Sequence, residues 1–369
     1  MTKIGDIFQK KLTYLPNSII VPRYTKELEN TALGHLAGIG ELMGVEIELE
    51  ASPNSGFMFP DITKWTAIKD GSLRDISIEY VFAKPYYGAQ IIGALKDLET
   101  CLIGAPLSLS YRTSTHVHIN ILDLTTEQLV SMILLYALAE PAIYAMAGAG
   151  RVNNNYCVPF FYDNHGVREV LATLLESKST GDVARITGVI NDLRPRYSGL
   201  NLHSIIDHGS LEFRHFRASV KFKELIDFVN IPIRLKNAAK SFDNPVLLAH
   251  IIKNFREKEE IAHFLAKYSI IDANEDIPTS VVGTFFDIFP NKSAKNRTIN
   301  PFPQRFLREV ELEVLTNSNA SSAKPKGVPL LNEIREREPP EFRYRAAEVL
   351  IRGWAQVIEE ARVPLEEEL

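Results

Sequence analysis

The feature that most constrains the fold is a short run in which charged and apolar residues alternate, "GVEIELE" over residues 44–50. Three glutamates, Glu46, Glu48 and Glu50, alternate there with Val, Ile and Leu. A β-strand points successive side chains to opposite faces, so this run would present one apolar face and a row of carboxylates about 7 Å apart. Such a row faces either water or something positively charged.

Later stretches of the sequence repeat this pattern. "SIEYVF" places Glu79 opposite an apolar face, "THVHIN" does the same for His116 and His118, and "SLEFRHF" for Glu212 and Arg214. Each stretch therefore predicts a strand with one face for a hydrophobic core and one face of metal-binding or phosphate-binding side chains.

We expect these polar faces to combine on one sheet. So many carboxylates cannot lie together ionised without cations. Oxygen ligands with few imidazoles and no thiolates suit Mg²⁺, with Mn²⁺ as an alternative, better than zinc. Arg214 would then neutralise a phosphoryl group held by the ions. The residues expected to converge are Glu46, Glu48, Glu79, His118 and Glu212.

Each signal alone has a plainer interpretation. A lone Glu-x-Glu is most often a solvated face, and a lone His-x-His is as often a hydrogen-bonded pair as a ligand pair. "DGS" over residues 70–72 is by itself a turn, and Glu-Phe-Arg could be a cross-strand ion pair. The joint occurrence of these signals is what favours a site.

Strands and helical patterns alternate irregularly, which predicts an α+β fold with a largely antiparallel sheet. A tight hairpin is expected around residues 207–209, and helices from about residue 220 onward, the last over residues 341–362. The apolar stretch 131–150 reads as a buried helix that kinks or breaks near Pro141, and not as a membrane span.

Three regions are expected along the chain. Residues 1–43 form an N-terminal segment that packs on a catalytic domain, residues 44–240 form that domain, and residues 241–369 form a helical C-terminal portion of the same or an appended domain.

Composition narrows the partners and the compartment. A net charge of −5 argues against nucleic acid as a required partner, because binding to a phosphate backbone needs a concentrated basic surface. The two cysteines lie far apart and the N-terminus lacks the apolar run of a signal peptide, so we expect a cytoplasmic protein with no membrane partner.

The order of the motifs is more specific than any one of them. "GVEIELE", then "W…DGSL…IEYVFAKP", then "HVHIN", then "RYSGLNLHS…GSLEFRHF" resembles the amidoligases of the glutamine synthetase and glutamate–cysteine ligase-like superfamily, over about residues 44–220. The resemblance implies an ATP- and Mg²⁺-dependent carboxylate–amine ligase on a curved, largely antiparallel sheet of the glutamine synthetase catalytic-domain type, with flanking helices.

The resemblance also implies roles for individual residues. Glu48, Glu212 and Arg214 are expected in catalysis, with Arg214 facing the transferring phosphoryl group, and His116 is a less certain neighbour of the ligand His118. The implied metal ligands are Glu46, Glu48, Asp70, Glu79, His118 and Glu212. The implied contacts to nucleotide or substrate are Arg151, Arg196, Tyr197, Asn201 and Arg214.

In the implied reaction, a carboxylate attacks the γ-phosphate of ATP and an amine then attacks the acyl phosphate. The substrates would be a small-molecule or peptide carboxylate and amine, and a homo-oligomer remains open. Three other functions stay open at this point: phosphotransfer from ATP without amide formation, metal-dependent hydrolysis, and a non-catalytic scaffold.

Overall fold

The computed structural model describes most of the chain between residues 3 and 270. The predicted helix over residues 341–362 lies outside the described residues. Those described are residues 3–8, 30, 32, 34–74, 76–148, 151, 154–160, 164–180, 182–193, 197–254 and 258–270.

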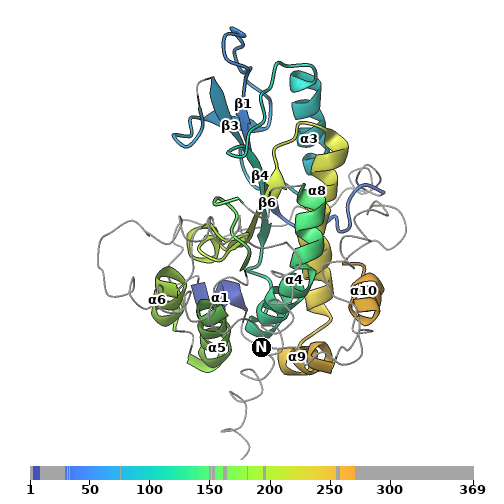
Figure 1. Ribbon diagram of the computed structural model, residues 1–369. Coiled ribbons are helices and arrows are strands. Elements are labelled where there is room, and N and C mark those ends of the chain that lie inside the picture. Colours follow the sequence, from blue (N-terminus) through green and yellow to red (C-terminus); the bar gives the residue numbers. More distant parts are fainter. Residues whose placement is uncertain are drawn as a thin grey trace, which may run out of the picture.

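A mixed sheet-and-helix architecture confirms the α+β prediction (Figure 1). The sheet has the order β2-β3-β1-β4-β6-β5, and every neighbouring pair is antiparallel. Its strands are β1 (Met43–Glu50), β2 (Trp65–Ile68), β3 (Ser77–Phe82), β4 (Ser114–Asn120), β5 (Leu200–Asn201) and β6 (Ser210–Arg217).

One face of this sheet contributes its apolar side chains to the hydrophobic core. Val45, Ile47 and Leu49 of β1 are each at most 1% exposed, as the alternation in the sequence predicts. Helices cover this face and leave the glutamate face on the other side of the sheet (Figure 1). The covering helices are α3 (Ala89–Leu102), α4 (Thr126–Ala147) and α8 (Phe222–Lys240).

Helix α4 is the predicted apolar helix, and it begins with a capping box. The hydroxyl of Thr125 accepts from the backbone N–H of Gln128, and the Gln128 side chain accepts from the Thr125 N–H. Of the expected kink or break near Pro141, the break is wrong, because the helix continues through that residue to Ala147. Among the described residues, no helix combines the length and apolarity needed to cross a membrane.

The predicted tight hairpin before β6 is also wrong in detail. β5 and β6 do pair antiparallel, but a short helix, α7 (Ser204–His208), connects them. The connection ends at Gly209, whose φ of 67° lies in the left-handed region that glycine adopts without steric cost.

The remaining helices join the same core. Two of them are α5 (Asn164–Thr180) and α6 (Val183–Leu193). The start of the helical C-terminal portion appears as α9 (Pro245–Asn254) and α10 (Lys258–Lys267), with Leu248 and Leu265 fully buried. At the other end, α1 (Ile4–Phe8) hydrogen-bonds to the backbone of Leu122 and Leu124.

Candidate metal and phosphate site

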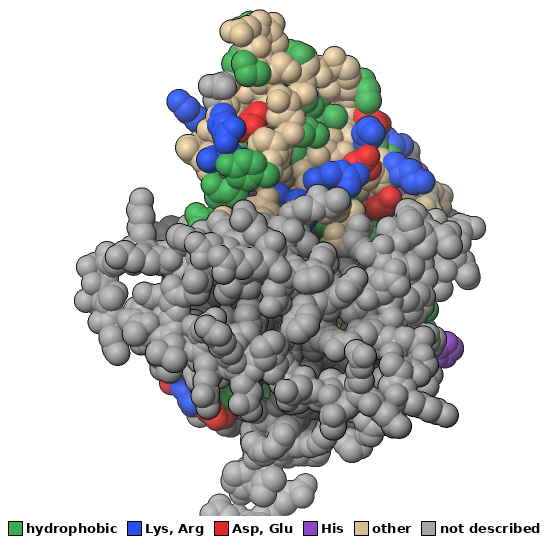
Figure 2. All heavy atoms as spheres, viewed as in Figure 1, with side chains coloured by type: hydrophobic (Ala, Val, Ile, Leu, Met, Phe, Trp, Pro, Cys, Tyr) green, Lys and Arg blue, Asp and Glu red, His purple; other side chains and the backbone are tan. Residues whose placement is uncertain are grey.

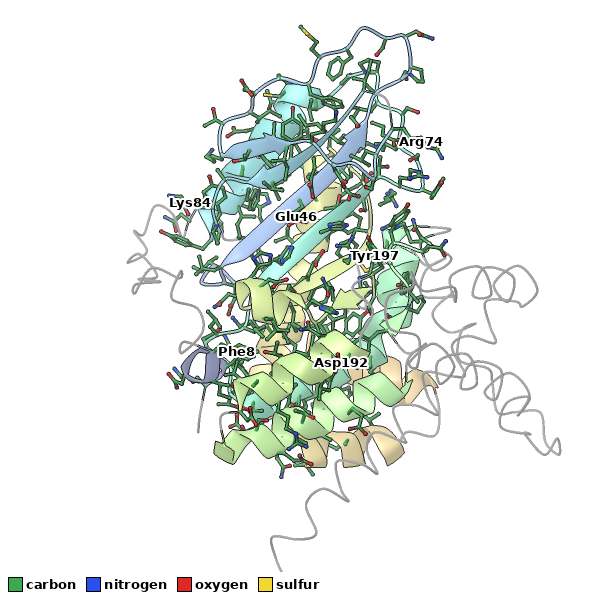
Figure 3. All side chains as sticks on the ribbon, turned by 90° about the vertical axis from the view of Figure 1, so that its left-hand side faces the viewer. Phe8, Glu46, Arg74, Lys84, Asp192 and Tyr197 are labelled. Atoms are coloured by element: carbon green, nitrogen blue, oxygen red, sulfur yellow. The ribbon has the colours of Figure 1, made fainter. Side chains whose placement is uncertain are left out.

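Strand register brings the predicted polar residues together. Glu46 lies opposite His116, Glu48 opposite Glu79, and His118 opposite Glu212, each as a cross-strand pair. These side chains come from β1, β3, β4 and β6, and all point to the face that the helices leave free. Figure 3 looks onto this face, with Glu46 near its centre. The sequence therefore predicted the meeting of the four strands correctly.

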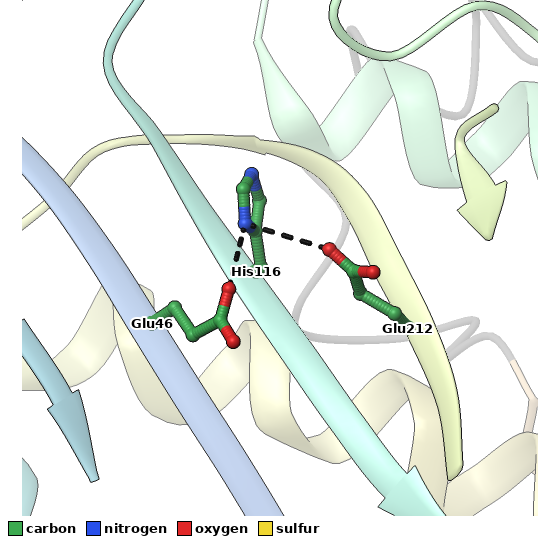
Figure 4. Close-up of side chains that lie close together, drawn as sticks. All are labelled: Glu46, His116 and Glu212. Carbon is green, nitrogen blue, oxygen red and sulfur yellow. Dashed lines mark hydrogen bonds and ion pairs between the residues drawn. The ribbon is translucent and has the colours of Figure 1, made fainter. Parts of the chain in front are cut away.

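His116 is the central residue of the cluster (Figure 4). Its Nδ1 lies 3.1 Å from Oε2 of Glu46 and 3.5 Å from Oε1 of Glu212. The ring is 2% exposed, so these contacts are shielded from water. At this position β4 and β6 change register, so that Arg214 and His215 together oppose His116. Such a bulge redirects side chains locally.

Two groups of side chains have the composition and spacing of a divalent metal site. One is Glu46, His116 and Glu212, and the other is Glu48, Glu79 and His116. In each group the candidate ligand atoms lie within 4.8 Å of one another. Carboxylate oxygens with a single imidazole suit Mg²⁺ or Mn²⁺.

The charges in the cluster fit a bound cation. Burial raises the pKa of Glu79 to about 7, and the carboxylates of Glu46 and Glu48 add to that rise. Burial would also raise the pKa of Glu46, but hydrogen bonds from His116 and His118 outweigh it and hold this pKa far below the usual range. A divalent ion would compensate the charge that keeps Glu79 partly protonated.

The geometry favours His116 over His118 as the metal ligand, the reverse of the sequence-based assignment. His118 Nε2 lies 3.2 Å from Oε1 of Glu46, and Nδ1 lies 3.1 Å from the hydroxyl of Ser210. Gly44 lies opposite His118, and a Cβ at Gly44 would be 3.3 Å from the His118 Cβ. Neither three-ligand group found among the described residues includes His118.

Both carboxylate oxygens of Glu212 accept a hydrogen bond. Arg214 donates to its Oε1 through Nη1, and Asn201 Nδ2 donates to its Oε2 at 2.6 Å. Burial would raise the pKa of Glu212, but Arg214, His118 and His116 together outweigh it and keep this pKa low. Arg214 therefore lies at the edge of the cluster, as predicted. Asn201 also accepts from the His203 N–H, so both ends of its amide are used within the protein and it orients Glu212.

The other predicted nucleotide or substrate contacts have different positions. Tyr197 is 49% exposed, and the Arg214 guanidinium lies 5.7 Å from its ring centroid. Arg151 is 5% exposed and donates to the backbone oxygens of Arg214 and His215, so it braces β6 from within the protein. Arg196 lies outside the described residues.

Two acidic residues of the sequence prediction lie at the margin. Both carboxylate oxygens of Asp70 accept from Ser72, which is a local turn, and Asp70 belongs to neither three-ligand group. Its charge still contributes to the raised pKa of Glu79. Glu50 is 6% exposed and accepts from the backbone N–H of Arg74, so it supports a loop and is not solvated.

An arginine pair, Arg74 and Arg112, extends the polar face beyond Glu50. Arg74 Nη2 and Arg112 Nε lie 3.1 and 3.2 Å from the hydroxyl of Tyr111. Arg112 also contacts the hydroxyl of Tyr156, whose backbone oxygen accepts from Arg214. No carboxylate in the described part of the chain lies within ion-pair distance of either member of the pair. The pair could thus bind an anionic group.

A pocket of about 210 Å³ opens at the opposite end of the cluster. Glu46 and His118 line it on the side of the cluster, and Lys84 lines it on another side. In Figure 3, Lys84 lies at one side of the strands and Arg74 and Tyr197 at the other. Figure 2 shows Lys and Arg side chains at both flanks of the upper part of the molecule, with hydrophobic side chains toward its tip.

Sequence reasoning missed several of these residues. β2 was not predicted, and its Ile68 lies opposite Glu79 on the polar face. Ser114 was also missed, although it precedes His116 by two residues and so shares its face of the strand. The arginine pair comes from two loops whose sequences carry no recognisable pattern.

Fold and site together define an α+β protein with an antiparallel sheet that carries a cluster of acidic and imidazole side chains on one face. No protein-family model matches the chain. No curated protein matches it either.

Proposed function

We propose that this protein is an ATP- and Mg²⁺-dependent carboxylate–amine ligase that forms an amide through an acyl phosphate, on a sheet of the glutamine synthetase catalytic-domain type. One observation carries the proposal. Carboxylates from β1, β3 and β6 meet around His116 of β4, with Arg214 attached to the same cluster. The motif order in the sequence supports the same function.

The first step places an anionic carboxylate against the anionic γ-phosphate of ATP. Bound Mg²⁺ ions would supply the positive charge that makes this approach possible. The groups Glu46–His116–Glu212 and Glu48–Glu79 would hold the ions, and Arg214 would stabilise charge on the transferring phosphoryl group. The amine then attacks the acyl carbon, and phosphate leaves.

The polar face offers a binding place on each side of the cluster. The pocket beside Glu46 and His118 has an apolar lining from residues such as Val81, Phe82 and Leu122, which suits a ring or a hydrocarbon portion. The arginine pair on the other side suits a phosphate or carboxylate group. Two substrates could therefore approach the ions from opposite ends.

The test is an assay of the purified protein with ATP, Mg²⁺ or Mn²⁺, and pools of amino acids, polyamines and short peptides. We expect ADP and free phosphate in equal amounts and a product lighter than its two precursors by one water. Glu48→Gln should be inactive. Glu176→Gln, an exposed carboxylate on α5, is the matched control and should retain activity.

Each alternative gives a different result in this assay. ADP without free phosphate, together with a phosphorylated acceptor, would mean phosphotransfer. Turnover without nucleotide would mean hydrolysis. If calorimetry detects no binding of ATP or Mg²⁺, the protein is a non-catalytic scaffold and the ligase proposal is wrong.

A further inference from the structure

Ser114 connects the two candidate metal groups, and no motif in the sequence assigns it a role. It is the first residue of β4 and is 1% exposed. Its hydroxyl is hydrogen-bonded to Oε2 of Glu48 and lies 2.7 Å from Nε2 of His116. A single hydroxyl thus touches Glu48, which belongs to one group, and His116, which belongs to both.

The proton of this hydroxyl can serve only one of its two partners. The hydroxyl of Ser114 is the donor in its hydrogen bond to Oε2 of Glu48. The Ser114 oxygen then faces His116 as an acceptor, and Nε2 of His116 must carry the hydrogen that it receives. Without an ion, Nδ1 also needs a hydrogen to meet the carboxylate of Glu46 at 3.1 Å. An ion bound by Glu46 and Glu212 would take the place of that hydrogen and leave the tautomer with hydrogen on Nε2.

This assignment leaves Nδ1 of His116 as the nitrogen that can bind a metal. Nδ1 is the atom that faces Glu46 and Glu212, at 3.1 and 3.5 Å. Nε2 lies 4.0 Å from Oε2 of Glu48, but its bond to Ser114 makes it unavailable to an ion between Glu48 and Glu79. The two groups therefore cannot share the imidazole, although both contain it.

We propose that Ser114 is a positioning residue that holds His116 in the Nε2–H tautomer and commits it, through Nδ1, to an ion bound with Glu46 and Glu212. The two metal positions are consequently unequal. One has a nitrogen ligand, and the other, at Glu48 and Glu79, has only oxygen ligands from the protein. Outer hydrogen bonds of this kind typically change metal affinity by about 10- to 100-fold. The inference rests on the proposed metal-dependent function.

The first test measures metal binding without any turnover. Mn²⁺ is titrated by calorimetry into the wild type, Ser114→Ala and Ser114→Thr, and electron spin-echo spectroscopy with ¹⁵N-histidine reports nitrogen coupled to the bound Mn²⁺. We expect one histidine nitrogen in the wild type and a loss of at least about tenfold in affinity for the nitrogen-containing position in Ser114→Ala. Ser114→Thr, which keeps the hydroxyl, should restore both.

The matched control is Ser131→Ala. Ser131 is also fully buried and donates one hydrogen bond, to the backbone oxygen of Phe242, away from the cluster. It should lose comparable thermal stability with no change in Mn²⁺ affinity. Equal Mn²⁺ affinity and unchanged nitrogen coupling in Ser114→Ala would overturn the role of Ser114 and leave the ligase proposal intact. Absence of metal binding in the wild type would overturn both.

A second measurement decides the matter if Ser114→Ala does not fold. Two-bond ¹H–¹⁵N correlations of the Mg²⁺-loaded wild type identify which nitrogen of His116 carries hydrogen. Hydrogen on Nε2 with a bare Nδ1 is the expected result. Hydrogen on Nδ1, or on both nitrogens, would overturn the inference.

Discussion

Glu46 and His116 lie directly opposite each other on β1 and β4, and Oε2 of the glutamate is 3.1 Å from Nδ1 of the histidine. The two residues are 70 positions apart in the sequence. Their pairing brings the glutamates of β1 and the histidines of β4 into a single cluster of side chains. The contacts around that pair, and the framework that holds it, have testable consequences.

Glu79→Gln should stabilise the metal-free protein in a pH-dependent way. Because the folded-state pKa of Glu79 is about 7, above its ordinary value of 4.5, its ionisation destabilises the folded state as the pH rises between those values. The gain in free energy of unfolding over the wild type should be near zero at pH 4.5 and largest above pH 7. Urea titrations across this range measure it.

Added Mg²⁺ should make the wild type more stable than Glu79→Gln, because the wild type binds the ion more tightly than the variant does. A variant that is less stable than the wild type at pH 8 without metal would show that Glu79 is a structural residue.

Arg214→Lys should lower turnover by about 100-fold while leaving Mn²⁺ binding within a few-fold of the wild type. Lysine keeps the positive charge beside Glu212 but lacks the planar guanidinium. In the wild type that guanidinium also donates to the backbone oxygen of Tyr156 and lies against the ring of Tyr197. The rate of ADP release at saturating substrate measures the effect. Turnover equal to the wild type would remove Arg214 from the reaction.

The double variant Arg74→Ala and Arg112→Ala should raise the KM for one anionic substrate by at least about tenfold, with little change in metal affinity. Two guanidiniums that lie at one phenol and have no carboxylate partner among the described residues are well placed to bind an oxyanion. Arg185→Ala on α6, which removes an exposed arginine paired with Glu176, is the control. Unchanged KM values for ATP and for the carboxylate would show that the pair binds neither.

Arg151→Ala should destabilise the protein by about 2 kcal/mol or more, because its guanidinium satisfies two buried backbone oxygens of β6. The sequence alone favoured a substrate contact for this residue. At a temperature where the variant is folded, its KM values should match the wild type. A raised KM with normal stability would restore the substrate role.

Lys236→Met should cost about 3 kcal/mol of unfolding free energy without affecting metal binding. The Lys236 ammonium is fully buried and donates hydrogen bonds to Glu41 and Asp123. These bonds connect the loop before β1 and the loop before α4 to helix α8. Lys240→Met is the milder comparison, since Lys240 is partly exposed. A stability equal to the wild type would mean that the apolar replacement compensates the lost ion pairs.

Lowering the pH should weaken the ion pairs of Asp123 with Lys236 and Lys240. Burial would raise the pKa of Asp123, but Lys236 and Lys240 outweigh it and keep this pKa below its usual value. The stabilisation is therefore present above the ordinary aspartate pKa and is lost as the pH falls through the folded-state value. It should be absent from Asp123→Asn, whose stability would change less with acid.

The sequence alone was enough to predict the strands and which face of each is buried. A period of two in "GVEIELE" and "THVHIN" leaves only one way to bury the apolar residues, so the placement of Glu46, Glu48 and His118 on the polar face followed directly. The same period could not identify His116 as the central histidine. That depends on the register between β4 and its neighbours and on the bulge opposite His116.

Local patterns also failed where distant contacts decide the outcome. Pro141 predicted a kink or a break, and the break does not occur, because α4 continues through this residue and packs against β6, α5, α8 and α9. The family resemblance implied a ligand contact for Arg151, and only its burial against β6 shows where its hydrogen bonds go.

The sequence thus determined the chemistry of the polar face, because alternation along a strand is a local property that needs no knowledge of partners. Tertiary structure decided which atoms of that face meet. The contacts of Glu46 with His116, of Glu48 with Ser114 and of Arg74 with Tyr111 each join side chains far apart in the chain, and only the folded structure sets their distances.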